Sequence, residues 1–452
     1  MSDHFDLVVI GGGPGGLEAA QKAASLQKKV LIVEKEGWGG TCTHKGCIPT
    51  KALLTCSRFY TDLKKFKRLG VQMTETSYDF AAMKKHRDST VKIAALGAQK
   101  ILHDAGVDIR RKTAEILSAG DIRLTDADGQ TQQVSADRLL IAWGAVPQIL
   151  PGLFPSPKIM TSDDILHIAT PPASMIVIGG SFIGVEFATF FAELGVKIIL
   201  VEWLDGILPM EDDEAAKLLH QELERLGISV HTSTKMMSLK ESAEGVVMQA
   251  QKNGETMEIR AECALLCTGR LPLLPIEELD RLGLHYTQTG IQVDEKMRTN
   301  VPGVYAVGDA TGGMMLAHRA QVQAKIAVAD MFGIQTLPYD EIAIPSVVYS
   351  HPPIARVGYT ERRARKEGLP LDISKSPYSA NIMARTELTA QGFVKAVFSE
   401  DVLIGATIVG DGAGDLIAPL SLAVANRMSR KQLRTWVLPH PTLSEVLAAL
   451  TV

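Results

Sequence analysis

Two cysteines in a glycine-rich segment are the residues of this chain best suited to chemistry. Cys42 and Cys47 lie within Gly39–Lys51, with four residues between them. If the first turn of a helix brings them together, this spacing allows a disulfide, and a helix N-terminus with Lys45 and Lys51 nearby would favour a thiolate. Two unbridged thiols and a metal-binding pair are the alternatives. A metal pair is disfavoured because no second ligand pair with zinc spacing is visible.

The other reactive side chains have structural interpretations at this level. Cys263 and Cys267 lie an even number of positions apart on an expected strand, so they share a face and are expected in the core. Cys56 is expected to be buried in the same way. His440 precedes a proline, a setting that on sequence alone is more often structural than catalytic. The cysteine segment therefore needs its neighbouring elements to define its chemistry.

The residues before the cysteine segment predict a β-α-β unit. Apolar runs predict strands at Leu7–Ile10 and Val30–Glu34, and an alanine-rich stretch from about 15 to 26 predicts a helix between them. Three glycines of the intervening turn allow a tight bend, a close pyrophosphate and close helix packing: Gly11, Gly13 and Gly16. Glu34 ends the second strand, where a carboxylate accepts the hydroxyls of an adenosine ribose. The unit predicts a dinucleotide site.

The same unit occurs a second time. The spacing from Gly179 to Glu202 equals that from Gly11 to Glu34. Ser181 replaces the middle glycine, so either the backbone stands farther from a pyrophosphate or the hydroxyl contacts it. Two closing segments also correspond, each a strand followed by a glycine crossing: Leu139–Pro147 and Ala264–Pro272. Glu202 favours NAD, because a 2′-phosphate at this point would meet a carboxylate.

Length and composition indicate a folded protein of several domains. The 452 residues suffice for about three domains, and 46% hydrophobic and 22% charged residues are typical of globular chains. A formal net charge of -4 predicts no nucleic-acid partner. No membrane association is expected, since Glu186 and Glu193 interrupt the most apolar region. Five cysteines are too few for a secreted disulfide scaffold, and residues 1–6 resemble no export signal, so a cytoplasmic protein is expected.

The expected fold class is α/β, with two Rossmann-like dinucleotide-binding domains and a carboxyl-terminal α+β domain. The first nucleotide domain is expected at 1–148 and 272–338, with the second inserted at 149–271 and the last domain at 339–452. Three strand-like runs define the last domain: Ser346–Tyr349, Gly392–Phe398 and Leu403–Val409. Helical stretches are expected near 412–428 and 442–450.

Together these segments resemble the flavin-dependent pyridine nucleotide–disulfide oxidoreductase family, and within it most resemble the dihydrolipoyl dehydrogenases. The resemblance covers nearly the whole chain. Besides the glycine units and the cysteine segment, it rests on four motifs: Gly303–Asp309, Met315–His318, Ile344–Tyr349 and His440–Glu445. It implies FAD in the first nucleotide domain, NAD in the second, and a homodimer formed through the third.

The resemblance also implies roles for single residues. The positions that match FAD contacts are Gly11, Gly13, Gly16, Glu34, Lys51, Ala114, Gly144, Asp309, Met315, Leu316, Ala317 and His318. The positions that match NAD contacts are Gly179, Gly184, Glu186, Glu202 and Gly269. Lys51 would lie by the flavin and Asp309 would bind its ribityl chain, whereas Met315–His318 would contribute backbone contacts.

The implied catalytic residues are the cysteine pair and a histidine from the neighbouring subunit. Cys47 would face the flavin in a redox-active disulfide and Cys42 would exchange with substrate, while Glu445 would orient His440 as the general base. The implied reaction oxidises protein-bound dihydrolipoamide to lipoamide and reduces NAD+ to NADH. The implied partner is a lipoyl-bearing carrier protein or lipoyl domain, and no metal is implied.

Some positions depart from the family pattern. Trp143 stands where the family usually has threonine, and Leu438-Pro439 stand where dihydrolipoyl dehydrogenases commonly show His-Ala. The alternatives are an NAD(P)H-dependent reductase of another disulfide or of a metal ion, and a redox-sensing flavoprotein without turnover. Glu202 disfavours an NADPH-dependent reductase. The intact cysteine pair and the His440–Glu445 motif disfavour a protein without turnover.

Overall fold

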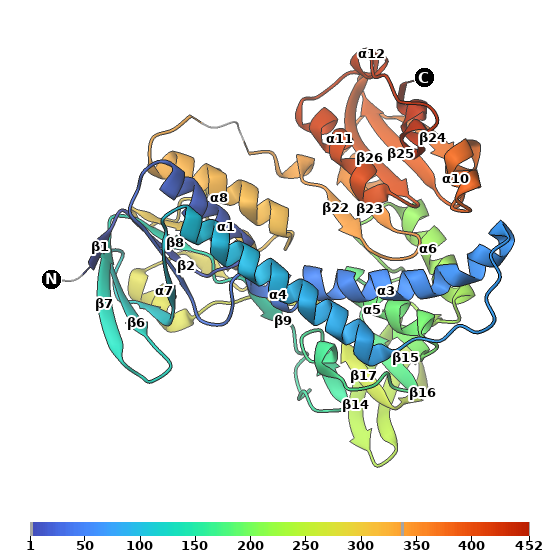
Figure 1. The fold of residues 1–452 in the computed structure, drawn as a ribbon, viewed down its shortest axis with the longest axis horizontal. Coiled ribbons are helices and arrows are strands. Elements are labelled where there is room, and N and C mark those ends of the chain that lie inside the picture. The colour runs from blue at the N-terminus through green and yellow to red at the C-terminus, as the bar shows by residue number, and fades with distance from the viewer. Residues whose placement is uncertain (1–2, 336–338, 452) are drawn as a thin grey trace. The chain divides into compact units, whose positions relative to one another are not determined.

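The computed structural model describes residues 3–335 and 339–451. The chain divides into two units, each assembled from three segments. The first unit comprises Met1–Ala52, Lys84–Gln148 and Arg270–Tyr339, and the second comprises Leu53–Met83, Ile149–Gly269 and Asp340–Val452. Figure 1 labels the elements of both.

A five-stranded parallel sheet lies at the centre of the first unit, in the order β21-β8-β2-β3-β4. Its strands are β2 (Leu7–Ile10), β3 (Val30–Glu34), β4 (Asp108–Arg111), β8 (Leu139–Ile141) and β21 (Val304–Ala306). The side chains of β2, β8 and β21 are all buried, as expected where both faces of a parallel sheet are covered. The strands expected at Leu7–Ile10 and Val30–Glu34 are confirmed.

Two alanine-rich helices lie side by side on one face of this sheet, α1 (Pro14–Ser25) and α8 (Ala317–Met331) (Figure 1). A Cβ added to Gly15 would lie 3.3 Å from the Cβ of Ala320. Small side chains are therefore what lets the two helices approach so closely. The end of α4 (Phe80–Asp104) packs on the same face through Leu102.

The opposite face packs against a four-stranded sheet in the order β1-β7-β6-β5. Its strands are β1 (Asp3–Phe5), β5 (Thr113–Ile116), β6 (Asp121–Thr125) and β7 (Thr131–Ala136). Smaller elements complete the first unit: β9 (Ala145–Pro147), β18 (Arg270–Pro272), α7 (Ile276–Leu282), β19 (Tyr286–Thr287), β20 (Gly290–Ile291) and the 3₁₀ turn η3 (Gly308–Thr311). Trp143 is half-buried against this core.

The second unit contains a parallel sheet of the same kind, in the order β10-β17-β11-β12-β13. Its strands are β10 (Ile159–Thr161), β11 (Ser174–Ile178), β12 (Lys197–Val201), β13 (Ser229–His231) and β17 (Cys263–Leu266). Two helices of this unit lie between its strands in the chain, α5 (Phe182–Glu193) and α6 (Asp213–Arg225). A three-stranded antiparallel sheet follows β13 in the chain: β14 (Thr234–Ser242), β15 (Gly245–Lys252) and β16 (Glu255–Ala261). The expected repeat of the β-α-β unit is therefore present.

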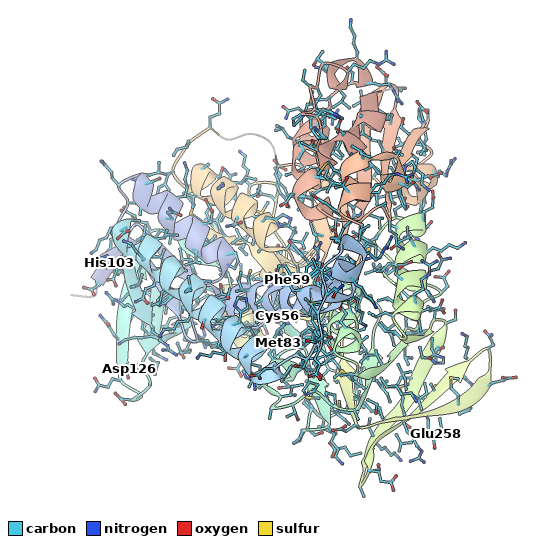
Figure 2. All side chains as sticks on the ribbon, turned by 45° about the vertical axis from the view of Figure 1, so that its right-hand side comes forward. Cys56, Phe59, Met83, His103, Asp126 and Glu258 are labelled. Carbon is cyan, nitrogen blue, oxygen red and sulfur yellow. The ribbon has the colours of Figure 1, made fainter. Side chains whose placement is uncertain are left out.

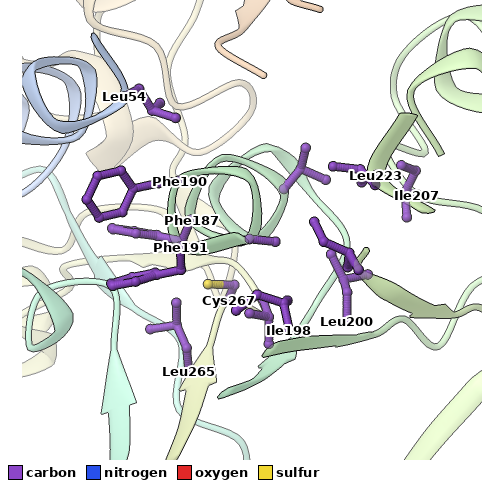
Figure 3. Close-up of a cluster of buried hydrophobic side chains, with 14 of the residues drawn as sticks. Leu54, Phe187, Phe190, Phe191, Ile198, Leu200, Ile207, Leu223, Leu265 and Cys267 are labelled. Carbon is purple, nitrogen blue, oxygen red and sulfur yellow. The ribbon is translucent and has the colours of Figure 1, made fainter. Parts of the chain in front are cut away.

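Phenylalanines of α5 form much of the core beside this sheet. Phe187, Phe190 and Phe191 gather above Leu265, and the sulfur of Cys267 points among them (Figure 3). Cys263 belongs to the same cluster, so the expectation that these two cysteines share a buried face is confirmed. Burial raises the pKa of Cys263 to about 12 and also raises the pKa of Cys267, so neither is set up as a nucleophile.

The carboxyl-terminal segment forms an antiparallel sheet in the order β22-β23-β26-β25-β24. Its strands are β22 (Ser346–Val348), β23 (Ile354–Gly358), β24 (Asp372–Pro377), β25 (Phe393–Ser399) and β26 (Val402–Val409). The associated helical elements are α9 (Glu361–Lys366), α10 (Ile382–Thr386), α11 (Ala413–Ala425), α12 (Arg430–Leu433) and the 3₁₀ segment η6 (Leu443–Thr451). The expected α+β character is confirmed, although the helix expected near 442–450 is of the 3₁₀ type.

The long helix α3 (Cys47–Phe66) begins in the first unit and continues in the second. The sequence assigned all of 1–148 to one domain, but Leu53 and Leu54 pack into the core around α5, and Tyr78 after the helix packs there too. Cys56 on α3 is only half-buried and lies outside the core clusters, which corrects its expected burial (Figure 2). The boundary expected at residue 338 lies outside the described residues.

Candidate active site

The cysteine segment lies directly against the first glycine turn. The Gly39 amide donates to the Gly12 carbonyl at 2.8 Å, and a Cβ added to Gly40 would lie 2.7 Å from the Cα of Gly13. Gly39 and Gly40 have φ values of 100° and 56°, a region where other residues are strained. Glycine at both positions therefore lets the chain bring Cys42 close to the turn expected to bind a dinucleotide.

Cys42 and Cys47 are brought together by two consecutive helices. Cys42 lies in α2 (Gly40–His44) and Cys47 is the first residue of α3. A hydrogen bond with Cys47, together with burial, raises the pKa of Cys42. The sulfurs are therefore near enough to exchange a bond. The N-terminus of the 20-residue α3 favours negative charge on Cys47.

The two lysines of this segment have different partners. Lys51 acts on Cys42 and favours its thiolate, against the stronger effects of Cys47 and burial. Lys45 instead donates to Glu36 Oε2 at 2.8 Å and lowers the pKa of that carboxyl. The expected effect of a lysine on the thiolate is therefore seen for Lys51. Sequence reasoning missed Glu36, although an acidic residue just after Glu34 was a visible signal.

The first glycine turn fits a dinucleotide phosphate. A Cβ added to Gly11 would lie 2.1 Å from the Ala142 carbonyl oxygen, and one added to Gly16 would lie 1.9 Å from the Gly11 oxygen, so both glycines are required by the fold. A Cβ on Gly13 would meet no protein atom within 4 Å. Gly13 is the N-cap of α1 and provides no side-chain cap, which leaves room and amide donors for an anion.

Glu34 closes the same turn from the second strand. Its Oε2 accepts from the Gly12 amide at 2.7 Å and its Oε1 accepts from the Glu36 amide at 2.6 Å. The carboxylate is thereby fixed at the strand end, where the hydroxyls of an adenosine ribose would lie.

Asp309 offers a hydrogen-bond acceptor near the end of β21, the edge strand of the same sheet. It lies in η3 directly after β21 and is half-buried. Burial raises the pKa of Asp309, and the nearby charges of Arg270 and Arg319 oppose this effect. A carboxylate that the protein leaves partly open fits a ligand hydroxyl such as one of a ribityl chain.

The remaining positions expected to contact FAD lie at element ends or in a strand. Met315 and Leu316 directly precede α8, and Ala317 and His318 are its first two residues. The N-cap residue Leu316 provides no side-chain hydrogen bond to the helix. This fits the expectation that the segment contacts FAD through its backbone. Gly144 links β8 to β9 with φ 76°, and its carbonyl accepts from Leu273. Ala114 is half-buried in β5, which touches β3.

The second glycine turn repeats this geometry. A Cβ on Gly179 would lie 2.3 Å from the Cys267 carbonyl oxygen, and one on Gly184 would lie 1.9 Å from the Gly179 oxygen. The Glu202 carboxylate accepts from the Gly180 amide at 2.6 Å. Ser181 has φ −79° and ψ −179°, almost the values of Gly13, −75° and −179°. The serine therefore leaves the backbone conformation of the turn unchanged and adds a hydroxyl group at the N-cap of α5.

Two further positions on the expected NAD side differ in their surroundings. Gly269 follows β17 with φ 121°, so glycine is needed at this crossing. Glu186 on α5 is only 3% exposed, and its Oε1 accepts from the Tyr349 amide at 3.0 Å. Sequence reasoning missed this link between α5 and the residue after β22.

His440 and Glu445 form the pair that the family resemblance implied. His440 Nδ1 and Glu445 Oε1 are 2.9 Å apart, and the other carboxylate oxygen accepts from the Thr442 amide at 3.1 Å. Both hydrogen bonds lower the pKa of Glu445. A carboxylate at Nδ1 orients the ring and leaves Nε2 to take a proton. The His440 side chain is 72% exposed, so a substrate can reach it.

Two dinucleotide turns, a thiol pair beside the first and a carboxylate-oriented histidine define a nucleotide-dependent disulfide oxidoreductase. The family model described as pyridine nucleotide-disulphide oxidoreductase matches residues 5–324, and the model of its dimerisation domain matches residues 344–450. The chain belongs to this family and forms a homodimer.

Similar proteins carry more specific names. A dihydrolipoyl dehydrogenase of Chlorobaculum parvum is 37% identical over 99% of this chain and 96% of its own length. One from Geobacillus stearothermophilus is 35% identical, covering 98% of this chain and 94% of its own. The crystal structure of LpdA from Mycobacterium tuberculosis has a TM-score of 0.92, 28% identity and 99% coverage of both chains.

Within residues 3–335 and 339–451, no helix has both the length and the hydropathy that crossing a membrane requires. In the same described part of the chain, no group of three or more His, Cys, Asp or Glu side chains is arranged to hold a metal ion.

Proposed function

We propose that this protein oxidises protein-bound dihydrolipoamide to lipoamide and reduces NAD+ to NADH, with FAD as its bound cofactor. The observation that carries the proposal is the Cys42–Cys47 pair, hydrogen-bonded at the start of α3 and held against the first glycine turn. Similarity to dihydrolipoyl dehydrogenases over nearly the whole chain supports the dithiol as substrate.

The thiol chemistry follows from the residues present. His440 Nε2 takes a proton from one substrate thiol, and the resulting thiolate attacks the Cys42 sulfur of the oxidised pair. The Cys42–Cys47 bond breaks, a substrate–Cys42 disulfide forms, and Cys47 leaves as a thiolate that the α3 N-terminus stabilises. The second substrate thiol then attacks the substrate sulfur, which releases lipoamide and leaves two electrons on the cysteine pair.

Two dinucleotides complete the cycle. Bound FAD supplies the two-electron transfer from the cysteine pair to NAD+. Gly11, Gly13, Gly16 and Glu34 would hold the ADP part of FAD, and Asp309 would accept from its ribityl chain, with the remaining contacts from Lys51, Ala114, Gly144 and Met315–His318. Gly179, Gly184, Glu186, Glu202 and Gly269 would hold NAD, and the Glu202 carboxylate would select against a 2′-phosphate.

Each dinucleotide has its own domain in this proposal. FAD would bind the domain expected at 1–148 and 272–338, of which residues 53–83 pack with the second unit. NAD would bind 149–271, and 339–452 would form the dimer. His440 and Glu445 serve the cysteine pair of the partner subunit, which fits the high exposure of His440 within its own chain. The partner is a lipoyl-bearing carrier protein or lipoyl domain, and the compartment is the cytoplasm.

The test follows NADH formation by the purified full chain with dihydrolipoamide and NAD+. We expect turnover with NAD+, at least ten-fold less with NADP+, and none in Cys42→Ser or Cys47→Ser. Alkylation followed by peptide mass spectrometry reports the thiols separately: Cys42 and Cys47 become modifiable only after dithiol reduction, whereas buried Cys263 and Cys267 stay unmodified throughout. Failure of both dihydrolipoamide and a lipoylated domain to reduce the pair would contradict the proposal.

A further inference from the structure

The turn that carries His440 is held by a side chain from a different part of the carboxyl-terminal sheet. Asn381 lies at the N-cap of α10 and is only 7% exposed. Its Nδ2 donates to the Thr442 carbonyl oxygen at 3.0 Å, while its Oδ1 accepts from the Ala384 amide at 2.9 Å. One buried amide therefore makes two hydrogen bonds, one within its own turn and one to the histidine turn.

Thr442 is the centre of the histidine turn. Its amide donates to Glu445 Oε2 at 3.1 Å, and its hydroxyl donates to the Pro439 carbonyl at 2.7 Å, one residue before His440. Glu445 in turn holds Nδ1 of His440 at 2.9 Å. Holding the Thr442 residue in place therefore positions both the carboxylate that orients the imidazole and the Pro439 carbonyl just before His440.

The two ends of this turn are anchored differently. Beyond Glu445, the side chains of Val446, Leu447 and Leu450 are buried in the core of the carboxyl-terminal sheet. On the histidine side, Trp436 and Leu438 are only partly buried against the same core. Asn381 adds a buried polar contact there, and its backbone amide donates to the carbonyl of the fully buried Tyr378 at 2.9 Å.

We propose that Asn381 is a positioning residue for the acid–base pair: by binding the Thr442 carbonyl it holds this residue so that Glu445 keeps His440 in its productive orientation. This inference rests on the proposed dithiol oxidation for its effect on turnover. The position of the imidazole itself can be measured without turnover.

Two substitutions separate capping from positioning. Asn381→Ser keeps a short oxygen for the Ala384 amide but cannot reach Thr442, and Asn381→Asp keeps the oxygen but loses the donor. Ser429→Ala is the matched control, because Ser429 caps α12 in the same segment and makes no hydrogen bond to the histidine turn among the described residues. All three variants are compared with wild type and with Glu445→Gln in the full dimer.

We expect both Asn381 variants to lower kcat for dihydrolipoamide oxidation about ten-fold while leaving the KM for NAD+ unchanged. Ser429→Ala keeps kcat within about two-fold of wild type at a similar loss of thermal stability. An equal loss of kcat in Ser429→Ala would assign the effect to general destabilisation and overturn the proposal.

A second measurement is independent of turnover. Diethyl pyrocarbonate modifies the imidazole nitrogens of histidine, and peptide mass spectrometry follows His440 alone at one fixed pH. We expect His440 to be modified faster in Asn381→Ser than in wild type, at a rate approaching that in Glu445→Gln, because a loosened carboxylate leaves Nδ1 more accessible. Modification rates identical to wild type in both Asn381 variants would overturn the inference. A wild-type enzyme inactive on dihydrolipoamide would instead contradict the proposed function and leave this readout intact.

Discussion

At the scale of single residues, glycine is required at different positions of the first nucleotide turn for different reasons. Gly11 and Gly16 are surrounded by backbone, whereas a side chain on Gly13 would meet only open space. The first two serve the fold, and the third serves whatever occupies that space. The fold alone would therefore tolerate a methyl group at Gly13.

This contrast gives a direct test of the first nucleotide site. We expect Gly13→Ala to fold with a melting temperature close to that of wild type but to bind FAD at least ten-fold more weakly, since the methyl group would occupy the pyrophosphate position. Gly11→Ala, with its oxygen contact at 2.1 Å, is expected to lose several kcal/mol of stability. Thermal melts and flavin fluorescence measure both quantities. Undiminished FAD affinity in Gly13→Ala would place the phosphate elsewhere.

Asp309, a proposed ligand-binding residue, lowers the stability of the folded chain when it is ionised. Burial raises the pKa of this carboxyl, so its ionised form destabilises the folded chain. The destabilisation is complete above the raised pKa and disappears as pH falls below the ordinary value of an aspartate, about 3.9.

We therefore expect Asp309→Asn to raise the melting temperature of the flavin-free protein by a few degrees at pH 7. The gain should shrink as the pH approaches 4, where the wild-type carboxyl is increasingly protonated. The same substitution should weaken FAD about ten-fold, because a charged acceptor is replaced by a neutral one. Parallel melts at the two pH values check the sign, and a gain that is equal at both would contradict it.

At the scale of elements, the start of α6 is an acidic run in which every carboxylate has a basic partner from the carboxyl-terminal sheet or helix. Glu211 pairs with Arg356 at 3.0 Å, and Asp213 pairs with Arg362. Asp212 and Glu214 both pair with Lys395, at 3.0 and 2.6 Å. These ion pairs join the inserted nucleotide segment to the carboxyl-terminal sheet within one unit.

Lys395 is the buried member of this network, with 2% exposure. Burial opposes its charge, but hydrogen bonds with Glu214 and Asp212 prevail and raise its pKa. Its stabilising contribution is therefore complete below the ordinary pKa of lysine, about 10.4, and is lost as pH rises through the higher folded value.

We expect Lys395→Met to cost about 3 kcal/mol at pH 7, because Asp212 would remain buried without its cation. Lys100→Met is the control, since it removes an ion pair with Asp104 that lies exposed to solvent and therefore changes stability little. Urea denaturation measures both. If the two variants lost equal stability, the network would have no special role.

At the scale of the whole molecule, the dimer is where the cysteine pair and the histidine pair would meet. The dimerisation-domain match and the exposed His440 support an active site shared between subunits. Mixing two inactive variants tests this sharing.

Cys42→Ser and His440→Gln protomers, unfolded together and refolded, form mixed dimers in half of the population. Each mixed dimer would join the intact cysteine pair of one chain to the intact histidine of the other at one of its two sites. One quarter of all sites in the mixture would then be functional. We expect about a quarter of the activity of the same amount of wild-type protein, against almost none in either parent variant. Activity no higher than that of the parents would assign His440 to its own chain.

The sequence alone determined the parts of this protein that depend on short-range geometry. The glycine turns with their acids and the four-residue cysteine spacing connect residues of one local unit, as in the Gly12–Glu34 bond across 22 positions. Backbone conformation and element order decide such contacts, and both are readable from residue types.

Only the tertiary structure decided which side chains meet across long separations. Lys395 and Asp212 are 183 positions apart, and Asn381 and Thr442 are 61 apart. It also decided that Lys45 pairs with Glu36 while Lys51 acts on Cys42, and that Cys56 stays outside the core. An acidic run or an N-cap asparagine has the same local sequence pattern whether its polar side-chain atoms face water or a distant residue of the chain. Only the packing of the elements decides which of the two occurs.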